Sequence, residues 1–203
     1  MTDKYKSTLD LLTPAAYVLA AAAICFVLLC STGCSSSGAA YVVATSDPAA
    51  GYDPGLGVRV DLTTHGTLRP VLKATMTNAA KSVADTGYTY SAYTGVAYGT
   101  TWYGEAGWLQ YGYKSTFKDG TVWKSDKNSW YSAVGYRAPN WSLALRYVPP
   151  TDDAYESDDI SLEGKVMFGK VILFAEPSIY SFKRNGQDKE THSSVRAGIG
   201  WHW

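Results

Sequence analysis

The sequence predicts an all-β protein, an antiparallel up-and-down transmembrane β-barrel of about ten strands. Three observations predict this fold class. Apolar and polar residues alternate over long stretches, and no stretch keeps a helical period for three turns. Glycine and proline interrupt the chain throughout. Short and long connections follow one another between the alternating stretches. Eight strands is the alternative, if residues 40–46 stay extended and another pair of strands merges.

Composition supports the same class. The chain has 203 residues, which is room for one domain. Its 18 basic and 18 acidic side chains balance, so no net charge draws it to nucleic acid. Charged residues make up 18 % of the chain, below the roughly 25 % of soluble domains. The 14 % of aromatic residues and the 19 glycines exclude a disordered chain and argue against a helical bundle.

Residues 1–34 differ from the rest, and we interpret them as a lipoprotein-type signal segment that precedes a barrel over residues 35–203. Residues 15–30 are an unbroken apolar run, shorter than the roughly 18–20 residues that span a bilayer. A retained inner-membrane helix is the alternative. The pair Gly33-Cys34 resembles the lipobox of bacterial lipoproteins, which implies lipidation of Cys34. Ser31 departs from that pattern, because the family prefers Leu there.

The remaining residues predict ten strands, each with one apolar face. The alternation is cleanest in the last strand, where Ile199 and Trp201 share a face and Arg196 lies on the other. The predicted strands are residues 40–46, 56–64, 67–77, 88–98, 102–117, 129–138, 140–148, 159–168, 171–183 and 192–203. Long polar connections are expected at residues 47–55, 78–87, 118–128, 149–158 and 184–191. Short turns join the other strands, and this asymmetry is typical of a bacterial outer-membrane barrel with a periplasmic N-terminus.

Periodicity alone does not say which face points outward, and a soluble, lipid-anchored β-sandwich is the alternative. Aromatic residues such as Trp102 and Trp130 fall near strand ends, where interfacial girdles lie. The polar face also carries many mid-strand charges, so we predict that it lines a wet lumen. The predicted basic cluster of this lumen comprises Arg59, Arg69, Lys73, Lys114, Arg137, Arg146, Lys165 and Arg196.

Only two acids, Asp61 and Glu163, are assigned to the same face as these bases. Unpaired charges cannot stay dry, so the excess of bases favours a narrow lumen that conducts anions or binds an anionic ligand. A solvated network of arginines and tyrosines that fills the tube is the other interpretation, because a barrel of this size is largely filled by side chains.

The C-terminal residues carry a specific motif. Arg196, Gly198, Trp201 and Trp203 supply a polar residue, a glycine and two hydrophobic positions, the last of them a terminal aromatic. This arrangement resembles the β-signal of outer-membrane barrel proteins. The resemblance implies that the barrel-assembly machinery is a partner.

Patterns for catalysis and for metal binding are weak. His192 and Ser194 share a strand face, and a His-x-Ser pair on a barrel strand is similar to that of lipid A deacylases, without the family's Asn-Pro-Gly context. An acidic stretch suits a solvated loop better than a Ca²⁺ site. Its members are Asp152, Asp153, Glu156, Asp158 and Asp159. We expect no cofactor and no metal.

The sequence therefore predicts an outer-membrane barrel protein with a non-catalytic structural, surface-interaction or narrow transport role. A small anion-favouring channel and a lipid-modifying enzyme are the alternatives. Membrane lipid is an expected partner and nucleic acid is not. The pattern does not indicate an oligomeric state.

Overall fold

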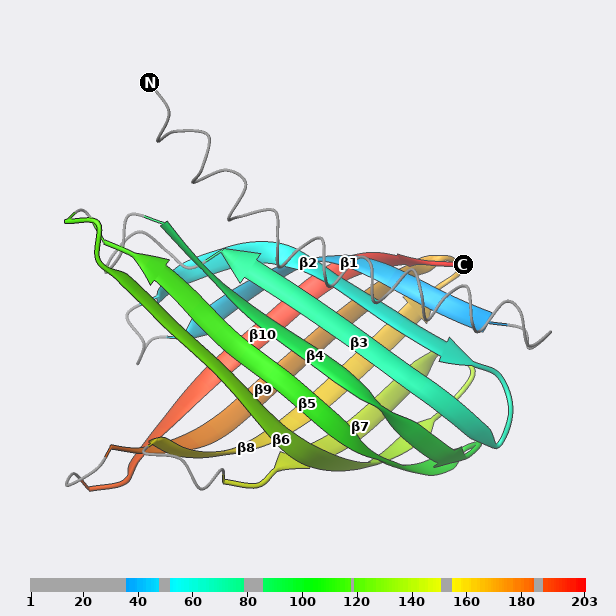
Figure 1. Cartoon of the computed structure of the whole chain (residues 1–203). Helices are drawn as coiled ribbons and strands as arrows, with labels where there is room; N and C mark the ends of the chain where they lie inside the picture. The colour runs from blue at the N-terminus through cyan, green and yellow to red at the C-terminus, as the bar shows by residue number, and fades with distance from the viewer. Residues whose placement is uncertain (1–35, 48–51, 79–85, 118, 151–154, 185–187) are drawn as a thin grey trace.

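The computed structural model describes residues 36–47, 52–78, 86–117, 119–150, 155–184 and 188–203. They form ten antiparallel strands, each paired with its neighbours in chain order, and β1 pairs with β10 to close the barrel (Figure 1). The strands are β1 (Ser36–Asp47), β2 (Tyr52–Thr64), β3 (Leu68–Asn78), β4 (Thr86–Gly99), β5 (Trp102–Thr116), β6 (Val122–Arg137), β7 (Trp141–Val148), β8 (Tyr155–Phe168), β9 (Val171–Arg184) and β10 (Glu190–His202). The predicted fold class and the count of ten are confirmed.

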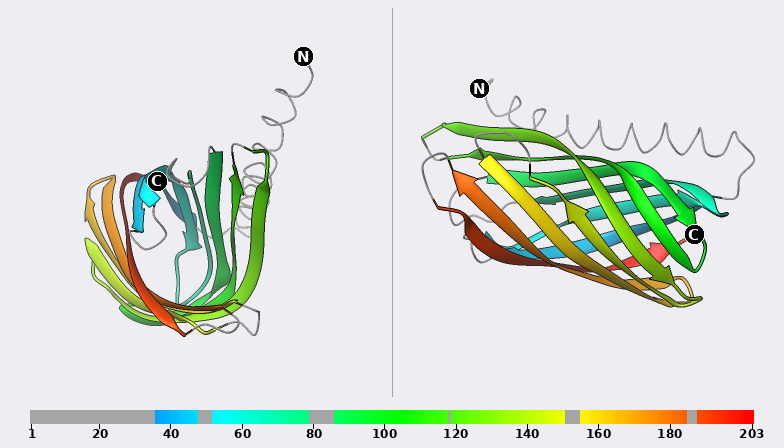
Figure 2. Two further views of the ribbon diagram at one scale, coloured as in Figure 1. Left: turned by 90° about the vertical axis from the view of Figure 1, so that its left-hand side faces the viewer. Right: turned by 90° about the horizontal axis from the view of Figure 1, so that it is seen from below.

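The two ends of the barrel differ. Short turns join β2 to β3, β4 to β5, β6 to β7 and β8 to β9 at the end that also holds the C-terminus, which we call the turn end (Figure 1). The opposite end, the loop end, holds the remaining connections; Figure 2 views the barrel along its axis and from below. Gly99 and Gly169 have φ of 111° and 61° in two of the short turns. Only glycine adopts such angles without strain, which explains their presence there.

Ten strands lie where the sequence predicts them, and several extend further. Residues 118–128 were predicted as a long connection, and this prediction is wrong for most of the segment: β6 begins at Val122, directly opposite Thr116. Lys124 and Asp126 give this part of β6 no apolar face, so hydrophobic alternation does not reveal it. The strand β8 likewise begins inside the predicted connection 149–158.

Some predicted features lie outside the described residues. These are the segment 1–34, with the lipidation position Cys34, and the acids Asp152 and Asp153. In the part of the chain that the structure does describe, no helix is long and apolar enough to cross a membrane.

The apolar face of the strands points outward. On β7 the side chains of Leu143 and Leu145 are 43 % and 49 % exposed, whereas Ala144 and Arg146 between them are 3 % and 1 % exposed. Large apolar side chains are exposed in the same way all around the wall. A soluble barrel or sandwich buries its apolar face, so this arrangement is that of a barrel in lipid.

The lumen is filled with side chains at the turn end. Tyr41, Ile172 and Phe174 pack with Ala39 and Val43 into a buried cluster. Inward-facing glycines leave room for the rings. A Cβ atom on Gly198 would lie 2.6 Å from the ring of Phe174, and one on Gly200 would lie 2.4 Å from the ring of Tyr41. A second buried cluster at this end consists of Val71, Ala97, Tyr103 and Ala144.

Candidate functional site

Charged side chains cross the lumen at mid-height. They form what we call the central belt, which comprises Arg59 and Asp61 of β2, Lys73 of β3, Glu105 of β5, Arg146 of β7, Glu163 and Lys165 of β8, Glu176 of β9 and Arg196 of β10. The alternation of each strand directs these side chains inward, and most of them are buried. Buried charges are tolerated only when they are paired.

Arg59 is one centre of the belt. Its guanidinium donates hydrogen bonds to Asp61 at 2.7 and 3.0 Å, to Glu176 at 3.2 Å and to Glu163. The Arg59 Cζ atom also lies 4.8 Å from the ring centroid of Phe174, on the turn-end side. A planar guanidinium with several donors suits such a junction, because it contacts three carboxylates and a ring at once.

Glu176 is the second centre. Its carboxylate accepts hydrogen bonds from Arg146 at 2.5 Å, from Arg59 at 3.2 Å and from Arg196 at 3.2 Å. The Arg146 guanidinium also lies over the ring of Tyr93, with 4.6 Å between Cζ and the centroid. The Ser161 hydroxyl of β8 also donates to Glu176 at 3.5 Å, so five strands (β2, β7, β8, β9 and β10) are joined through this single carboxylate.

The belt spans the full width of the barrel. Lys73 on β3 and Glu163 on β8 lie five strands apart around the wall, and their charged atoms are 3.8 Å apart. Lys73 also donates to Glu105 at 3.1 Å. On the other side, Lys165 donates to Asp61 at 2.6 Å and lies 3.1 Å from Glu163. Opposite walls of the barrel therefore meet through side chains at this level.

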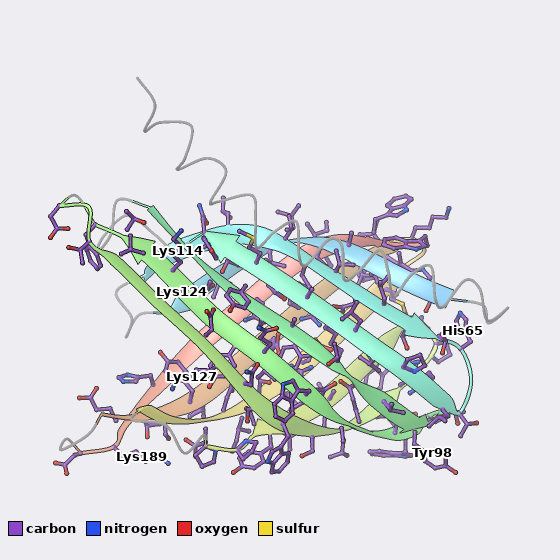
Figure 3. The ribbon with its side chains drawn as sticks, in the orientation of Figure 1. His65, Tyr98, Lys114, Lys124, Lys127 and Lys189 are labelled. Atoms are coloured by element: carbon purple, nitrogen blue, oxygen red, sulfur yellow. The ribbon has the colours of Figure 1, made fainter. Side chains whose placement is uncertain are left out.

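The predicted basic cluster is divided among three places. Five of its members belong to the belt: Arg59, Lys73, Arg146, Lys165 and Arg196. Arg69 and Arg137 instead lie at the turn end, where each guanidinium is 5.4 Å from the ring centroid of Tyr103. Lys114 lies near the loop end and faces outward, because Glu105 and Leu109 of the same strand face inward (Figure 3). Its assignment to the lumen is wrong. Both faces of β5 carry apolar residues, so the alternation does not show which set of side chains points inward.

The sequence pattern missed two acids of the belt, Glu105 and Glu176. Their neighbours on the inward face, Tyr103 and Leu109 in β5 and Ile172 and Phe174 in β9, are apolar, so neither stretch looked like a polar face. With these acids the belt holds five cations and four carboxylates, not the large excess of bases that was expected. The one indication in the sequence was that Glu105 and Glu176 each interrupt a strand face that is otherwise largely apolar, where a charge would not face lipid.

Aromatic side chains mark two levels on the outer surface. At the turn end, the ring of Tyr136 lies 4.9 Å from that of Trp102 and 5.1 Å from that of Trp141. Toward the loop end, Trp108 lies directly opposite Trp130, and both are about half exposed. Aromatic rings concentrate at such levels where apolar and polar surroundings meet.

Beyond Trp108 and Trp130, the strands β5 and β6 continue toward the loop end, and β4 pairs with this part of β5 over residues 86–93; we call the β5–β6 part the loop-end ribbon (residues 109–116 and 122–129; Figure 3). Its outward side is polar: Lys124 lies 2.6 Å from Asp126, and both are well exposed. At the tip, the backbone N–H of Thr121 donates to Asp119 at 2.9 Å, and this hydrogen bond lowers the pKa of Asp119. The ribbon is suited to water rather than lipid.

No protein-family model matches the chain, and no curated protein sequence matches it. Among solved structures, it is similar to the anion-selective porin from Comamonas acidovorans, with a TM-score of 0.37 and 14 % identity over 74 % of this chain. It spans about half of the porin, 49 % of its length. It is also similar to neisserial surface protein A, with a TM-score of 0.38 and 16 % identity, over 82 % of this chain and 94 % of that protein. A likeness to the toluene transporter of P. putida has a TM-score of 0.26 and 8 % identity, over 82 % of this chain and 88 % of the transporter. At these scores, none of the likenesses assigns a function or ligand to this chain.

The residues singled out for catalysis have other partners. His192 Nε2 lies 3.2 Å from a carboxylate oxygen of Glu190, and the Ser194 hydroxyl is 2.7 Å from that of Ser178. Both side chains face the lumen near the loop end, away from the lipid-facing surface that a lipid-modifying enzyme would use. Among the described residues, no group of three or more His, Cys, Asp or Glu side chains is placed to hold a metal ion.

Proposed function

We propose that the protein is a bacterial outer-membrane barrel with a closed lumen, which has a non-catalytic role at the cell surface. The outward apolar face supports the membrane placement. On β8 this face runs from Phe168 to Ile160, about 26 Å along the strand at about 3.3 Å per residue. At the usual tilt of 35–45° this is about 20 Å along the axis, close to the roughly 25 Å apolar band of such barrels.

The proposed orientation places the turn end in the periplasm and the loop end outside the cell. Short turns on the periplasmic side and longer connections outside are typical of outer-membrane barrels. β1 begins at the turn end with Ser36, two residues after Cys34. A lipid on Cys34 would therefore lie at the periplasmic side, which agrees with the proposed lipoprotein processing.

The orientation can be tested with single cysteines, because all three native cysteines lie within residues 1–34. Asn128→Cys in the loop-end ribbon should react with a membrane-impermeant maleimide on intact cells. His65→Cys in a short turn should react only after the outer membrane is permeabilised. The opposite pattern would contradict the orientation. A heat-dependent shift in gel mobility of the outer-membrane fraction would support a folded barrel.

The observation that carries the closed lumen is the contact between Lys73 and Glu163 across the barrel. Together with the packed turn-end half, this contact supports a lumen that is closed to hydrated ions. The protein is then suited to interaction at its exposed loop end, where the loop-end ribbon stands beyond the Trp108–Trp130 level.

Conductance in planar bilayers tests this proposal. We expect the wild-type protein to give no steady open-channel current. The double variant Lys73→Ala/Glu163→Ala removes one cation and one anion, so it keeps the charge balance and should raise the conductance. Ser178→Ala, in the lumen but outside the belt, is the matched control and should stay closed. Steady anion-selective currents from the wild-type protein would instead favour the small anion channel.

We also propose that the C-terminal motif is read during assembly. Trp203 is exposed at 48 % on the outer side, so it is accessible to another protein. Trp203→Ala should reduce the amount of barrel in the outer membrane several-fold, whereas the purified variant should still refold in detergent. Equal losses in both experiments would mean that Trp203 has only a structural role.

A further inference from the structure

The barrel wall is uneven where β6 passes β7. β7 has 8 residues, between the 16 residues of β6 and the 14 of β8. The β6–β7 pairing runs only from Ser132–Tyr147 to Arg137–Ser142. Within the described part of the chain, residues 122–131 of β6 therefore pair with β5 alone.

The chain turns inward directly after β7. Val148 is buried in a cluster with Tyr131, and Pro149 is buried next to it. The carbonyl oxygen of Pro149 accepts a hydrogen bond from the inward-facing Ser129 hydroxyl at 3.4 Å. The β6–β7 ladder therefore ends where the chain after β7 leaves the outer surface.

A recess of about 370 Å³ lies on the outer face over the last paired residues of β6 and β7 and the adjoining Ile160 of β8. Its outward-facing lining is mainly apolar: Val134, Leu145 and Ile160 are each about half exposed. Tyr147 also lines it and packs against Trp130, with ring centroids 6.3 Å apart. The recess therefore lies within the apolar band, directly below the aromatic level of the loop end. The full lining is Ser132, Ala133, Val134, Leu145, Arg146, Tyr147 and Ile160.

We infer that this recess binds one acyl chain of an outer-leaflet lipid. The inference rests on the membrane placement proposed above. The recess lies where an acyl chain is expected. A lipid whose headgroup lies at the level of Trp130 and Tyr147 directs its acyl chains toward the turn end, along Val134 and Leu145. The volume lies within the 300–1,000 Å³ of small-molecule sites. A chain in the recess contacts protein on several sides, whereas one on a smooth wall contacts it on one side only, so dispersion favours the recess.

Photo-crosslinking with a labelled phospholipid tests the inference. The full chain is reconstituted in phosphatidylethanolamine and phosphatidylglycerol vesicles that contain a small share of phospholipid with a diazirine in its acyl chain. After illumination, mass spectrometry locates the adducts. We expect at least threefold more adducts on the outward residues of the recess, Val134, Leu145, Tyr147 and Ile160, than on the outward residues of β9 and β10.

Filling the recess should remove this excess. Leu145→Trp places an indole in the recess and should make the labelling even around the barrel. Leu173→Trp, on the lipid-facing side of β9, is the matched control and should leave the excess unchanged. Even labelling of the wild-type protein would overturn the inference. This result comes from the wild-type protein alone, so it does not depend on whether a variant folds. Absence of labelling anywhere on the outer surface would contradict the membrane placement itself.

Discussion

The two halves of the lumen are built from different side chains. In the turn-end half, the rings of Tyr41 and Phe174 pack edge to face, with centroids 5.0 Å apart, within a cluster of buried apolar residues. In the loop-end half, hydroxyl groups face one another: Ser178 lies 2.7 Å from Ser194, and Thr77 lies 2.6 Å from Thr89. The central belt separates the two. Toward the loop end the lumen is thus mixed: hydroxyl groups lie on the β3–β4 and β9–β10 sides, and Tyr93, Leu109, Tyr131 and Val148 form a buried cluster on the β4–β7 side.

This difference gives the belt a dry side and a wet side. Arg59 lies toward the apolar cluster and its side chain is 2 % exposed, whereas Arg196 lies toward the hydroxyl groups and is 25 % exposed. Ion pairs are stronger where water is excluded, and the cost of an unpaired charge is also greater there. The halves should therefore respond very differently to substitution.

Removal of the shared carboxylate should have the largest effect. Glu176→Ala leaves three guanidiniums without their common partner, so the free energy of unfolding should fall by about 3–5 kcal/mol. Urea titration of the refolded barrel, followed by tryptophan fluorescence, measures this. Glu176→Gln is the control, because it keeps the size of the side chain and changes only its charge. A loss below about 1 kcal/mol in both variants would mean that the belt is well hydrated on both sides.

Opening the dry half should have the next largest effect. Phe174→Ala removes a buried ring and should lower the free energy of unfolding by about 3 kcal/mol. The same urea titration measures it. Phe168→Ala, on the outward face of the neighbouring strand, is the control and should cost less, since that ring is 64 % exposed.

The wet half should be the least sensitive. Ser178→Ala removes one hydroxyl–hydroxyl hydrogen bond and should lower the free energy of unfolding by about 0.5–1 kcal/mol, because water can replace the lost partner of Ser194. If the loss equals that of Phe174→Ala, the loop-end half is as dry as the turn-end half, and the contrast between the halves fails.

The alternation in the sequence was sufficient to locate the ten strands, and in most of them it separated the outward from the inward residues. In β7, Leu143 and Leu145 alternate with Ala144 and Arg146, and the structure places the leucines outside as expected. Such alternation is a property of one strand, so it can be recognised in the sequence without knowing which strands pair with it. The shortness of β7 was also visible in the predicted range 140–148.

The pairing within the lumen could not be predicted. The contact of Lys73 with Glu163 depends on the stagger of the strands around the whole barrel, which no local pattern encodes. Lys114 was placed in the lumen and lies outside, because the two faces of β5 are equally apolar. Glu176 was overlooked for the reverse reason, since its inward neighbours Ile172 and Phe174 resemble a lipid-facing stripe.

The junction of β1 with β10 has a consequence for how the barrel forms. It brings Ala39 against His202, so it joins the most distant described parts of the chain, whereas hairpins such as β5–β6 join adjacent ones. Distant pairings form slowly, because a large loop of chain must close first. Until they form, β1 and β10 each present an unpaired row of backbone groups that could recruit another chain. An incompletely assembled molecule is therefore more exposed to aggregation than a closed one.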